Sequence, residues 1–309
     1  MTTLALPLSA SELCAAVRQA RPFDAARLDR LLRVDASRGL AETQASATWS
    51  SLVARLHPGA EAALAPWKSY GTIADGLASN VAGPDGRPVV AHVESIALVT
   101  PDGELRRVGR GNDLFALVVG GQGLFGSPYS VTLRLESLAR ATMDCEPPAA
   151  LVLPDPVGAA RAAHFLVPPE ACGAFLGEAR ARCTEWRVAI EAAQARRTRP
   201  EEETLLRWAR REYAALTLRL AELPGLGGAV RATQLRRQLI DAAIAYGGSF
   251  PIACTPEATR AQAETCYPEL ARLLAEKRRL DPADRLSNSW YRHYRSLLGR
   301  ERCEVRWTR

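Results

Sequence analysis

Residues 69–83 read SYGTIADGLASNVAG, and residues 120–126 read GGQGLFG. Both stretches are small, rich in glycine and almost free of charge, which is unusual for an ordinary surface loop. A predicted hairpin lies between them, because a β-rich run over 89–100 ends in a Pro-Asp-Gly turn and a second run follows over 104–108. Two such loops could converge on an extended anionic ligand and bind it through backbone amides. A tight turn without a ligand is the alternative for each loop taken alone.

The second loop matches the GxGxxG spacing of a nicotinamide-dinucleotide fingerprint at 121–126. That fingerprint needs a strand before the glycines and a helix after them, so that the pyrophosphate meets a helix N-terminus. Here the order is reversed. A short apolar helix is predicted over 114–119, with Asn112 as its cap, and an alternating run over 129–136 predicts a half-buried strand after the loop. The nicotinamide interpretation therefore fails.

The pattern continues on both sides of the two loops. A helix is predicted over 9–21, a strand, turn and strand over 28–45, and a further helix over 48–56. Beyond residue 137 several prolines break the chain into short pieces, which predicts a lobe boundary at that point. The chain is thus predicted to belong to the α+β class, with two lobes.

The second lobe is predicted to be mostly helical. Residues 170–223 have a largely helical pattern, with a helix start at 198–203 where a proline is followed by three acids. Only residues 216–220 alternate, which leaves helix and strand open there. Further predicted elements are helices over 230–246 and 259–275 and a strand over 249–253.

The composition argues against metal and redox sites. Seven cysteines lack a CxxC pair, and four histidines lack the spacing of a metal pair on a helix, so no metal site is expected. The odd cysteine count favours free thiols in a reducing compartment. No secretory signal is recognisable at the N-terminus, and we expect a cytoplasmic protein.

The composition also argues against membrane and nucleic-acid partners. The uncharged run 114–133 contains several glycines and a proline, which is not the pattern of a membrane span. The net charge is +6, but basic residues are interleaved with acids along most of the chain. A nucleic-acid partner is therefore not expected, because the arginine-rich tail 292–309 is typical of a solvated terminal segment.

Five segments in a fixed order carry a family resemblance. They are ATWSSL at 47–52, SYGTIADGLASN at 69–80, NDLF at 112–115, GGQGLFG at 120–126 and VTLRL at 131–135. Together they resemble the PCMH-type FAD-binding domain of the vanillyl-alcohol oxidase and p-cresol methylhydroxylase superfamily. Segments 207–213, 246–249 and 280–294 are similar to the substrate lobe and closing segment of its FAD-linked sugar-alcohol-oxidase-like members.

The resemblance implies a two-lobed α+β fold with FAD as cofactor. It assigns residues 1–137 to the FAD-binding domain, 138–275 to a substrate or cap lobe of antiparallel sheet with helices, and 276–309 to a segment that returns to the FAD lobe. The implied activity is that of an FAD-dependent oxidoreductase acting on the CH–OH group of a small-molecule alcohol, which the protein orients against the flavin.

The resemblance also assigns residues to the site. The residues that it places against FAD are Ser69, Gly71, Thr72, Ile73, Gly76, Ser79, Asn80, Gly120, Gly121, Gly123, Phe125, Gly126, Val131 and Asn288. Tyr291 and His293 are the candidate catalytic residues, with His293 as base and Tyr291 orienting a hydroxyl substrate. The alternative for His293 is a surface histidine in an arginine-rich segment. Trp208 can line a pocket, although such aromatic residues more often belong to a core.

Two features depart from the family. Relatives carry a Gly-Gly-Gly-His-Ser type loop before the strand at 28–35, where this chain has only residues 22–27. The first half of the pyrophosphate cradle is therefore absent, and any flavin is non-covalent. No convincing general base follows Tyr246 either, since residues 250–254 read FPIAC. The alternative function is a flavin-free relative that serves as a binding or scaffold subunit, beside an intact paralogue or as a homo-oligomer.

Overall fold

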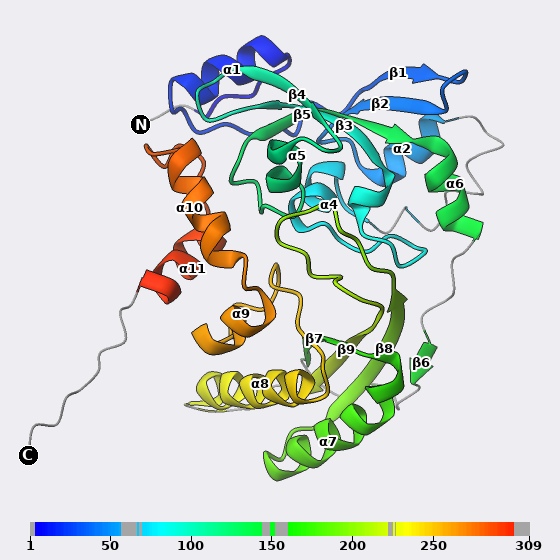
Figure 1. The fold of residues 1–309 in the computed structure, drawn as a ribbon, viewed down its shortest axis with the longest axis vertical. Helices are drawn as coiled ribbons and strands as arrows, with labels where there is room; N and C mark the ends of the chain where they lie inside the picture. Colours follow the sequence, from blue (N-terminus) through cyan, green and yellow to red (C-terminus); the bar gives the residue numbers. More distant parts are fainter. Residues whose placement is uncertain are drawn as a thin grey trace, which may run out of the picture.

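The computed structural model describes residues 4–56, 67, 70–143, 149–151, 160–221, 225 and 227–299. The chain is a mixed α/β protein with two antiparallel sheets, one of five strands and one of four. The two sheets lie at opposite ends of the molecule, and the helices near the C-terminus run along one side between them (Figure 1).

The five-stranded sheet is built by the first half of the chain. Its strands, in spatial order, are β1 (Leu31–Asp35), β2 (Leu40–Gln44), β5 (Ser127–Arg134), β3 (Val93–Val99) and β4 (Leu105–Gly109). Both predicted hairpins are confirmed: β1 pairs with β2, and β3 pairs with β4 across the turn at 100–103. The predicted strand after the glycine loop is β5, which lies at the centre of the sheet between β2 and β3.

Short helices cover the inner face of this sheet and its ends. They are α1 (Ala10–Arg18), α2 (Trp49–Arg55), α4 (Ile73–Ser79), the 3-10 helix η2 (Val89–His92), α5 (Asp113–Val118) and α6 (Leu135–Met143). Ser9, Thr48 and Asn112 cap α1, α2 and α5 through their side chains; for the first two helices the sequence left Ser9 or Ser11 and Ser46 or Thr48 open. The first glycine-rich stretch is not a loop throughout, because Thr72 and Asp75 form a capping box that starts α4.

The four-stranded sheet corrects the prediction of a mostly helical segment over 170–223. Its spatial order is β6 (Ala149–Leu151), β8 (Ile190–Thr198), β9 (Tyr213–Ala221) and β7 (Ala160–Val167). No helix starts at 198–203; an irregular segment over 199–212 joins β8 to β9 instead. Every second residue along β9 is buried, which is the period of a strand with one covered face. The 3-10 helix η3 (Pro169–Ala171), α7 (Cys172–Glu185) and α8 (Gly228–Ala245) pack on this end.

The C-terminal helices correct a second prediction. Instead of one helix over 259–275, the chain forms α9 (Arg260–Cys266) and α10 (Leu270–Leu280). Pro268 lies at the break, and a proline inside a helix removes a backbone hydrogen bond. After α10 the chain turns and forms α11 (Ser289–Gly299).

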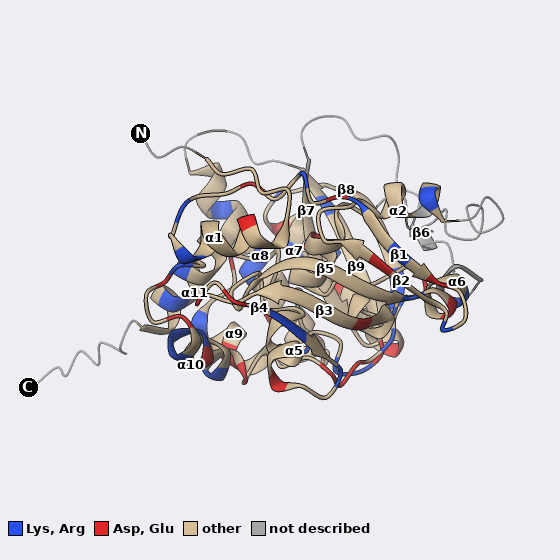
Figure 2. Cartoon of the chain, turned by 90° about the horizontal axis from the view of Figure 1, so that it is seen from above, with Lys and Arg blue, Asp and Glu red and all other residues tan. Residues whose placement is uncertain are grey.

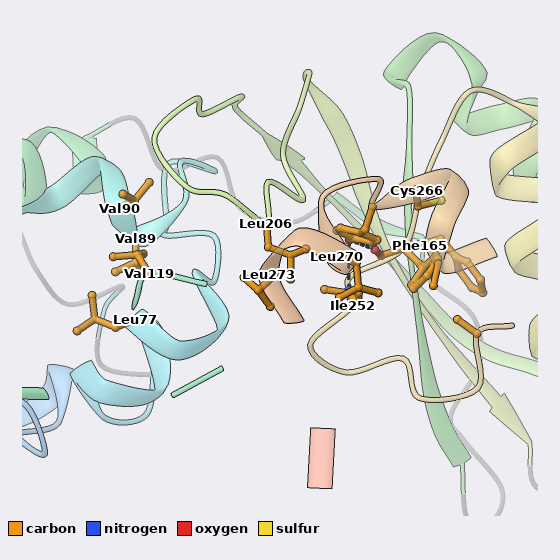
Figure 3. Packing of buried hydrophobic residues seen from close by; sticks show 14 of the residues in the cluster. Leu77, Val89, Val90, Val119, Phe165, Leu206, Ile252, Cys266, Leu270 and Leu273 are labelled. Carbon is orange, nitrogen blue, oxygen red and sulfur yellow. Dashed lines mark hydrogen bonds between the residues drawn. The ribbon is translucent and has the colours of Figure 1, made fainter. Parts of the chain in front are cut away.

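Most buried apolar residues form one large cluster that reaches from the inner face of the first sheet to the second sheet. A small second cluster joins α1 to the first sheet through Leu13, Val17, Leu28 and Val99. Leu206, from the irregular segment 199–212, lies beside Leu270 and Leu273 on the side that faces Leu77 and Val119 (Figure 3). The segment 199–212 therefore joins the packing of the two ends of the molecule and covers α4 and the glycine loop that follows α5.

Candidate functional site

The structure brings the two glycine-rich segments together. The Gly120 amide donates a hydrogen bond to the carbonyl of Leu77 at 2.8 Å, and the Gln122 amide donates to the carbonyl of Ala78 at 2.9 Å. The Gln122 side chain donates to the Ala78 carbonyl as well, at 3.1 Å. The last turn of α4 and the loop after α5 therefore lie side by side and are hydrogen-bonded to each other.

The backbone amides of the first segment are already bonded inside the protein. The Ile73 amide donates to the carbonyl of Ala47 at 3.0 Å, and the Ala74 amide donates to the carbonyl of Ala45 at 2.8 Å. The Thr72 amide donates to the Asp75 carboxylate at 3.3 Å. These are the amides that a pyrophosphate at the start of α4 would need. Their acceptors are main-chain and side-chain atoms of the chain itself.

The second loop is saturated in a similar way and is tightly packed. In addition to the Gly120 and Gln122 amides, the Gly121 amide donates to the Val118 carbonyl and the Leu124 amide to the Gly121 carbonyl. A Cβ on Gly121 would lie 1.9 Å from the Leu117 carbonyl oxygen. The missing side chain at Gly121 thus lets the chain pass close to its own α5, and the described contact there is with protein rather than with a ligand.

The segment 199–212 lies over the junction of the two loops. The Trp208 indole donates to the Asn80 carbonyl at 2.8 Å, and the Asn80 side chain accepts from the Val90 amide at 2.9 Å. The Asn80 side chain also lies 3.5 Å from the buried carboxylate of Glu201. Burial raises the pKa of Glu201, although hydrogen bonds from Thr204 and Glu203 act in the opposite direction. Asn80 is fully buried under this cover.

The closing segment reaches the same junction through one residue. The Asn288 side chain donates to the Gln122 carbonyl at 2.7 Å and accepts from the Tyr291 amide at 2.9 Å. The C-terminal segment thus contacts the first half of the chain at Gln122. Asn288 joins the glycine loop to the start of α11.

Tyr291 and His293 lie on α11. The Tyr291 ring is buried, with the Lys277 ammonium 5.1 Å from its centre on α10 and the Arg295 guanidinium 5.6 Å from it. Lys277 is itself buried and pairs with Asp281 at 2.5 Å. The half-buried His293 packs edge-on against the ring of Tyr294. These contacts place Tyr291 in the packing between α10 and α11, so its role as a catalytic residue stays a prediction.

The remaining residues predicted to contact FAD are spread over exposed and buried positions. Gly71 and Gly123 are exposed, Thr72 and Ser79 are half-buried, and Ser69 lies outside the described residues. The buried residues are Ile73, Gly76, Gly120, Gly121, Phe125, Gly126 and Val131. The structure thus joins the predicted segments, but most of their polar backbone groups face other parts of the protein.

A different site lies on the opposite, open face of the five-stranded sheet. A hollow of about 570 Å³, the β4 hollow, is bordered by outward-facing residues of all five strands. A second hollow of about 420 Å³, the Ser137 hollow, extends toward α6. The two share Arg38, Leu40 and Glu94. Blue and red segments are interleaved over β1, β2 and β4 on this side of the molecule (Figure 2).

Most arginines that border the two hollows are paired with acids. Arg107 bonds Glu42 at 2.7 Å, and Arg110 bonds Glu203 at 2.5 Å. Further pairs join Arg33 to Asp35, Arg87 to Asp85 and Arg140 to Glu136. Among the residues that the structure describes, the guanidiniums of Arg38 and Arg134 have no carboxylate partner.

Arg134 is the least satisfied of these side chains. One of its terminal nitrogens donates to the Ala91 carbonyl, but its Nε is buried and, within the described ranges, has no hydrogen-bond partner. Burial and the neighbouring Arg110 lower the pKa of Arg134, while Glu94 and Glu203 act against this change. A buried N–H without an acceptor costs about 1–3 kcal/mol, more for a charged group. Arg134 therefore favours an anion in the Ser137 hollow.

The sequence did not reveal these hollows. Their arginines come from β1, β4, β5 and the loops between strands, and no short motif joins them. The alternation of Val131, Leu133 and Leu135 against Thr132 and Arg134 was visible, and it predicts that Arg134 points away from the core. It does not predict that this arginine lacks a carboxylate partner.

Comparisons with known proteins match no family model and no curated protein. The resemblance to FAD-linked oxidoreductases therefore stays a prediction. In the described ranges, the structure has no helix that is long and apolar enough to cross a membrane and no cluster of three or more potential metal-ligating side chains.

Proposed function

We propose that this chain is a flavin-free binding protein, or binding subunit, whose ligand is a small anion held in the Ser137 hollow. The observation that carries the proposal is the Arg134 guanidinium at the wall of that hollow, whose buried Nε has no hydrogen-bond partner among the described residues. A carboxylate or phosphate that enters the hollow and reaches this guanidinium would supply an acceptor, and guanidiniums bind both groups with charge-assisted hydrogen bonds.

Arg38 supports the same ligand class. It borders both hollows, and within the described ranges its guanidinium forms no ion pair. Arg110 adds positive charge beside Arg134, because its presence lowers the pKa of Arg134. An anion placed between Arg38 and Arg134 would therefore gain attraction from several guanidiniums, opposed by the carboxylates of Glu94 and Glu136 that border the same hollow.

The glycine turns do not fit the pyrophosphate of FAD as they stand. The amides of Ile73 and Ala74 and those of Gly120, Gly121, Gln122 and Leu124 donate to acceptors within the chain, and Trp208 and Glu201 cover the junction at Asn80. A dinucleotide would have to replace these internal hydrogen bonds. We therefore derive no reaction step through FAD, and we assign the two turns a structural role in joining α4 to α5.

The proposal is tested by titrating the protein with adipate and with inorganic phosphate in a calorimeter. We expect binding by the unsubstituted protein and at least about tenfold weaker binding by Arg134→Gln, since one charge-assisted contact is lost. Arg106→Gln is the matched control, because Arg106 lies on β4, pairs with Asp102 and borders neither hollow. Equal affinities in the two variants would remove Arg134 from the site.

An FAD-dependent oxidoreductase with the two-lobed PCMH-type architecture is the second candidate. It is favoured by the meeting of α4, the glycine loop and Asn288 at Gln122, three segments that the resemblance assigns to the cofactor site. Titration with FAD decides between the two candidates. Saturable binding, seen as a change in the visible flavin spectrum, supports the oxidoreductase and overturns the flavin-free proposal, whereas no binding leaves the anion-binding role.

A further inference from the structure

A serine, a histidine and an aspartate lie together at the Ser137 hollow. The Nδ1 atom of His92 lies 2.7 Å from the Ser137 hydroxyl, and its Nε2 atom lies 3.7 Å from a carboxylate oxygen of Asp85. His92 is the last residue of η2, Ser137 lies in the first turn of α6, and Asp85 lies in the loop before η2. The three side chains thus come from separate segments, and the His92 ring contacts the Ser137 hydroxyl through Nδ1 and faces the Asp85 carboxylate through Nε2.

The burial of the three residues differs. His92 is fully buried and Asp85 is 8% exposed, whereas Ser137 is half-buried and borders the hollow. Of the three groups, the Ser137 hydroxyl is therefore the one that a ligand in the hollow can contact. The imidazole and the carboxylate lie behind it, on the interior side of the hydroxyl.

The carboxylate is held in the ionised form. Burial alone would raise the pKa of Asp85, but the interactions with His92 and with the amide and guanidinium of Arg87 outweigh it, and the pKa is lowered. An ionised Asp85 favours the proton on the Nε2 atom of His92, which leaves Nδ1 free to accept the proton of Ser137. The Trp67 and His92 rings pack edge to face with their centres 5.1 Å apart, and this contact further fixes the imidazole.

The His92–Asp85 contact is longer than a hydrogen bond. Among the described residues, the Nε2 atom of His92 has no hydrogen-bond partner, and the Asp85 carboxylate is the acceptor that the structure records near it. Hydrogen bonds of catalytic groups are often long without substrate and tighten when it binds. The distance of 3.7 Å between His92 Nε2 and the Asp85 carboxylate can therefore shorten when substrate binds.

The guanidinium of Arg134 lies next to Ser137. The Ala91 carbonyl lies 3.4 Å from the Ser137 hydroxyl and also accepts a hydrogen bond from the Arg134 guanidinium. Both groups therefore reach one oxygen atom. The orphaned Nε of Arg134 belongs to the same guanidinium, so positive charge is available where negative charge would develop on a substrate attacked by Ser137.

We propose that Ser137 is the nucleophile, His92 the base and Asp85 the positioning carboxylate of a site that hydrolyses an ester. The acyl part of this ester carries a free carboxylate in addition to the ester group. The ester class follows from the hydroxyl nucleophile and the buried base, and the second carboxylate follows from Arg38 and Arg134 at the same hollow. The substrate charge thus rests on the anion-binding role proposed above, while the nucleophile rests on the His92 contact alone.

The reaction balances with water as the only co-reactant. Ser137 Oγ forms a bond to the acyl carbon while its proton passes to His92 Nδ1, and the alcohol leaves with that proton as its bond to the acyl carbon breaks. Water then forms a bond to the acyl carbon and gives one proton to Nδ1. The bond from Ser137 to the acyl carbon breaks, Ser137 regains the proton from His92, and the free acid is released.

The nucleophile is tested with a neutral fluorophosphonate probe on the full chain, followed by intact mass and peptide mapping. We expect one label per chain, on Ser137, and none in Ser137→Ala. Ser95→Ala is the matched control and keeps the label, because Ser95 is a serine in the neighbouring β4 hollow. No label on the folded, unsubstituted protein, or a label on another residue, overturns the proposal.

The role of Asp85 is separated from a structural role by comparing rate with extent. In Asp85→Asn we expect labelling slower by about 100-fold, since the imidazole loses its orienting charge, but complete labelling at long times. A variant that has only lost stability would instead label a smaller final fraction at the original rate. That second result, or an unchanged labelling rate, means that Asp85 is not the positioning carboxylate.

The substrate class is tested with two esters of equal chain length, mono-p-nitrophenyl adipate and p-nitrophenyl hexanoate. We expect kcat/KM to favour the adipate ester by about 10- to 100-fold, and Arg134→Gln to lower this ratio toward one. If Ser137 is labelled but both esters react equally in both proteins, the nucleophile stands and the second carboxylate is wrong. If adipate binds without any labelling, the anion site stands and the hydrolytic proposal is wrong.

Discussion

The glycine junction and the Ser137 hollow differ in how their polar groups are paired. At the junction, the amides of Ile73, Ala74 and Gly120 each donate to a carbonyl of the chain, and the Trp208 indole donates to the carbonyl of the buried Asn80. At the hollow, the described part of the chain leaves the Nε of Arg134 and the Nε2 of His92 buried without a hydrogen-bond partner.

This difference separates structural from functional polar groups. Almost all buried polar groups in folded proteins find a partner, so a saturated site has little left to offer a ligand. An orphaned donor beside an open hollow costs free energy until something binds to it. The glycine-rich sequence attracts attention because it has few side chains, yet the unsatisfied Nε of Arg134 lies on the other face of the sheet, among arginines that form no motif. Other buried polar atoms without a partner in the described ranges include the Tyr291 hydroxyl and the Nε2 of His293 on α11.

The largest expected effect is at Gly121. Gly121→Ala places a Cβ 1.9 Å from the Leu117 carbonyl oxygen, a backbone atom that cannot rotate away. We expect the free energy of unfolding to fall by about 4 kcal/mol or more, measured by urea denaturation. Gly123→Ala is the control, since its Cβ would meet open space and only the left-handed backbone at φ +73° opposes it, at about 1–2 kcal/mol. Equal losses would argue against the packing role of Gly121.

The next effect is at Asn80, which the resemblance assigns to the cofactor. Asn80→Ala leaves the buried Val90 amide without an acceptor and puts alanine at φ 49°, so we expect a loss of about 2–4 kcal/mol of unfolding free energy without any ligand present. Ser79→Ala, one position earlier and half-buried, is expected to change stability by less than about 1 kcal/mol. A stable Asn80→Ala protein would reopen the ligand role.

A pH dependence is expected from Glu201 in the cover over the junction. Its folded-state pKa is raised by burial above the ordinary value of 4.5, so the carboxyl group favours folding when protonated. This contribution is complete below pH 4.5 and is lost as the pH rises through the raised pKa. Glu201→Gln stays neutral throughout. Denaturation series across this window should show a smaller fall in stability for the variant than for the unsubstituted protein, and parallel curves would contradict the prediction.

The smallest effect on stability is expected at Arg134. Arg134→Gln removes a charge whose Nε is unpaired, and the lost bond to the Ala91 carbonyl is offset by the desolvation that is no longer required. We expect the thermal midpoint in the absence of ligand to stay within a few degrees, equivalent to about 1 kcal/mol. A loss well above this value would mean that Arg134 is structural, and the contrast with the glycine junction would then disappear.

Sequence patterns predicted the elements whose signals are local. The helix starts that Ser9, Thr48 and Asn112 cap and the turn at 100–103 lie where the sequence predicts them, whereas four consecutive residues of β5 are buried instead of alternating. Each depends on residues within a few positions of one another, such as a hydroxyl that accepts an amide of the first turn. The resemblance placed Asn288 at the cofactor site, and in the structure its side chain bonds the Gln122 carbonyl.

Other elements depended on distant partners and were predicted wrongly. Residues 190–198 are rich in alanine and arginine, which favour helices, yet they form β8 because β9 offers a complete ladder of hydrogen bonds beside them. The acids after Pro200 suggested a helix start, but Glu201 turns inward and accepts the amides of Glu203 and Thr204 in an irregular segment. The missed break at Pro268 was a local signal that the surrounding apolar pattern concealed.

The sequence by itself determined the short elements of this protein, their turns, and the four glycines within 120–126. Tertiary structure alone decided which polar groups were left for a ligand. Ile73 and Ala74 lose their free amides to carbonyls of another segment, and Ser137 meets His92 across 45 positions of sequence. The physical reason is that a hydrogen bond belongs to two groups in space, so whether a donor is satisfied depends on neighbours that no local pattern contains.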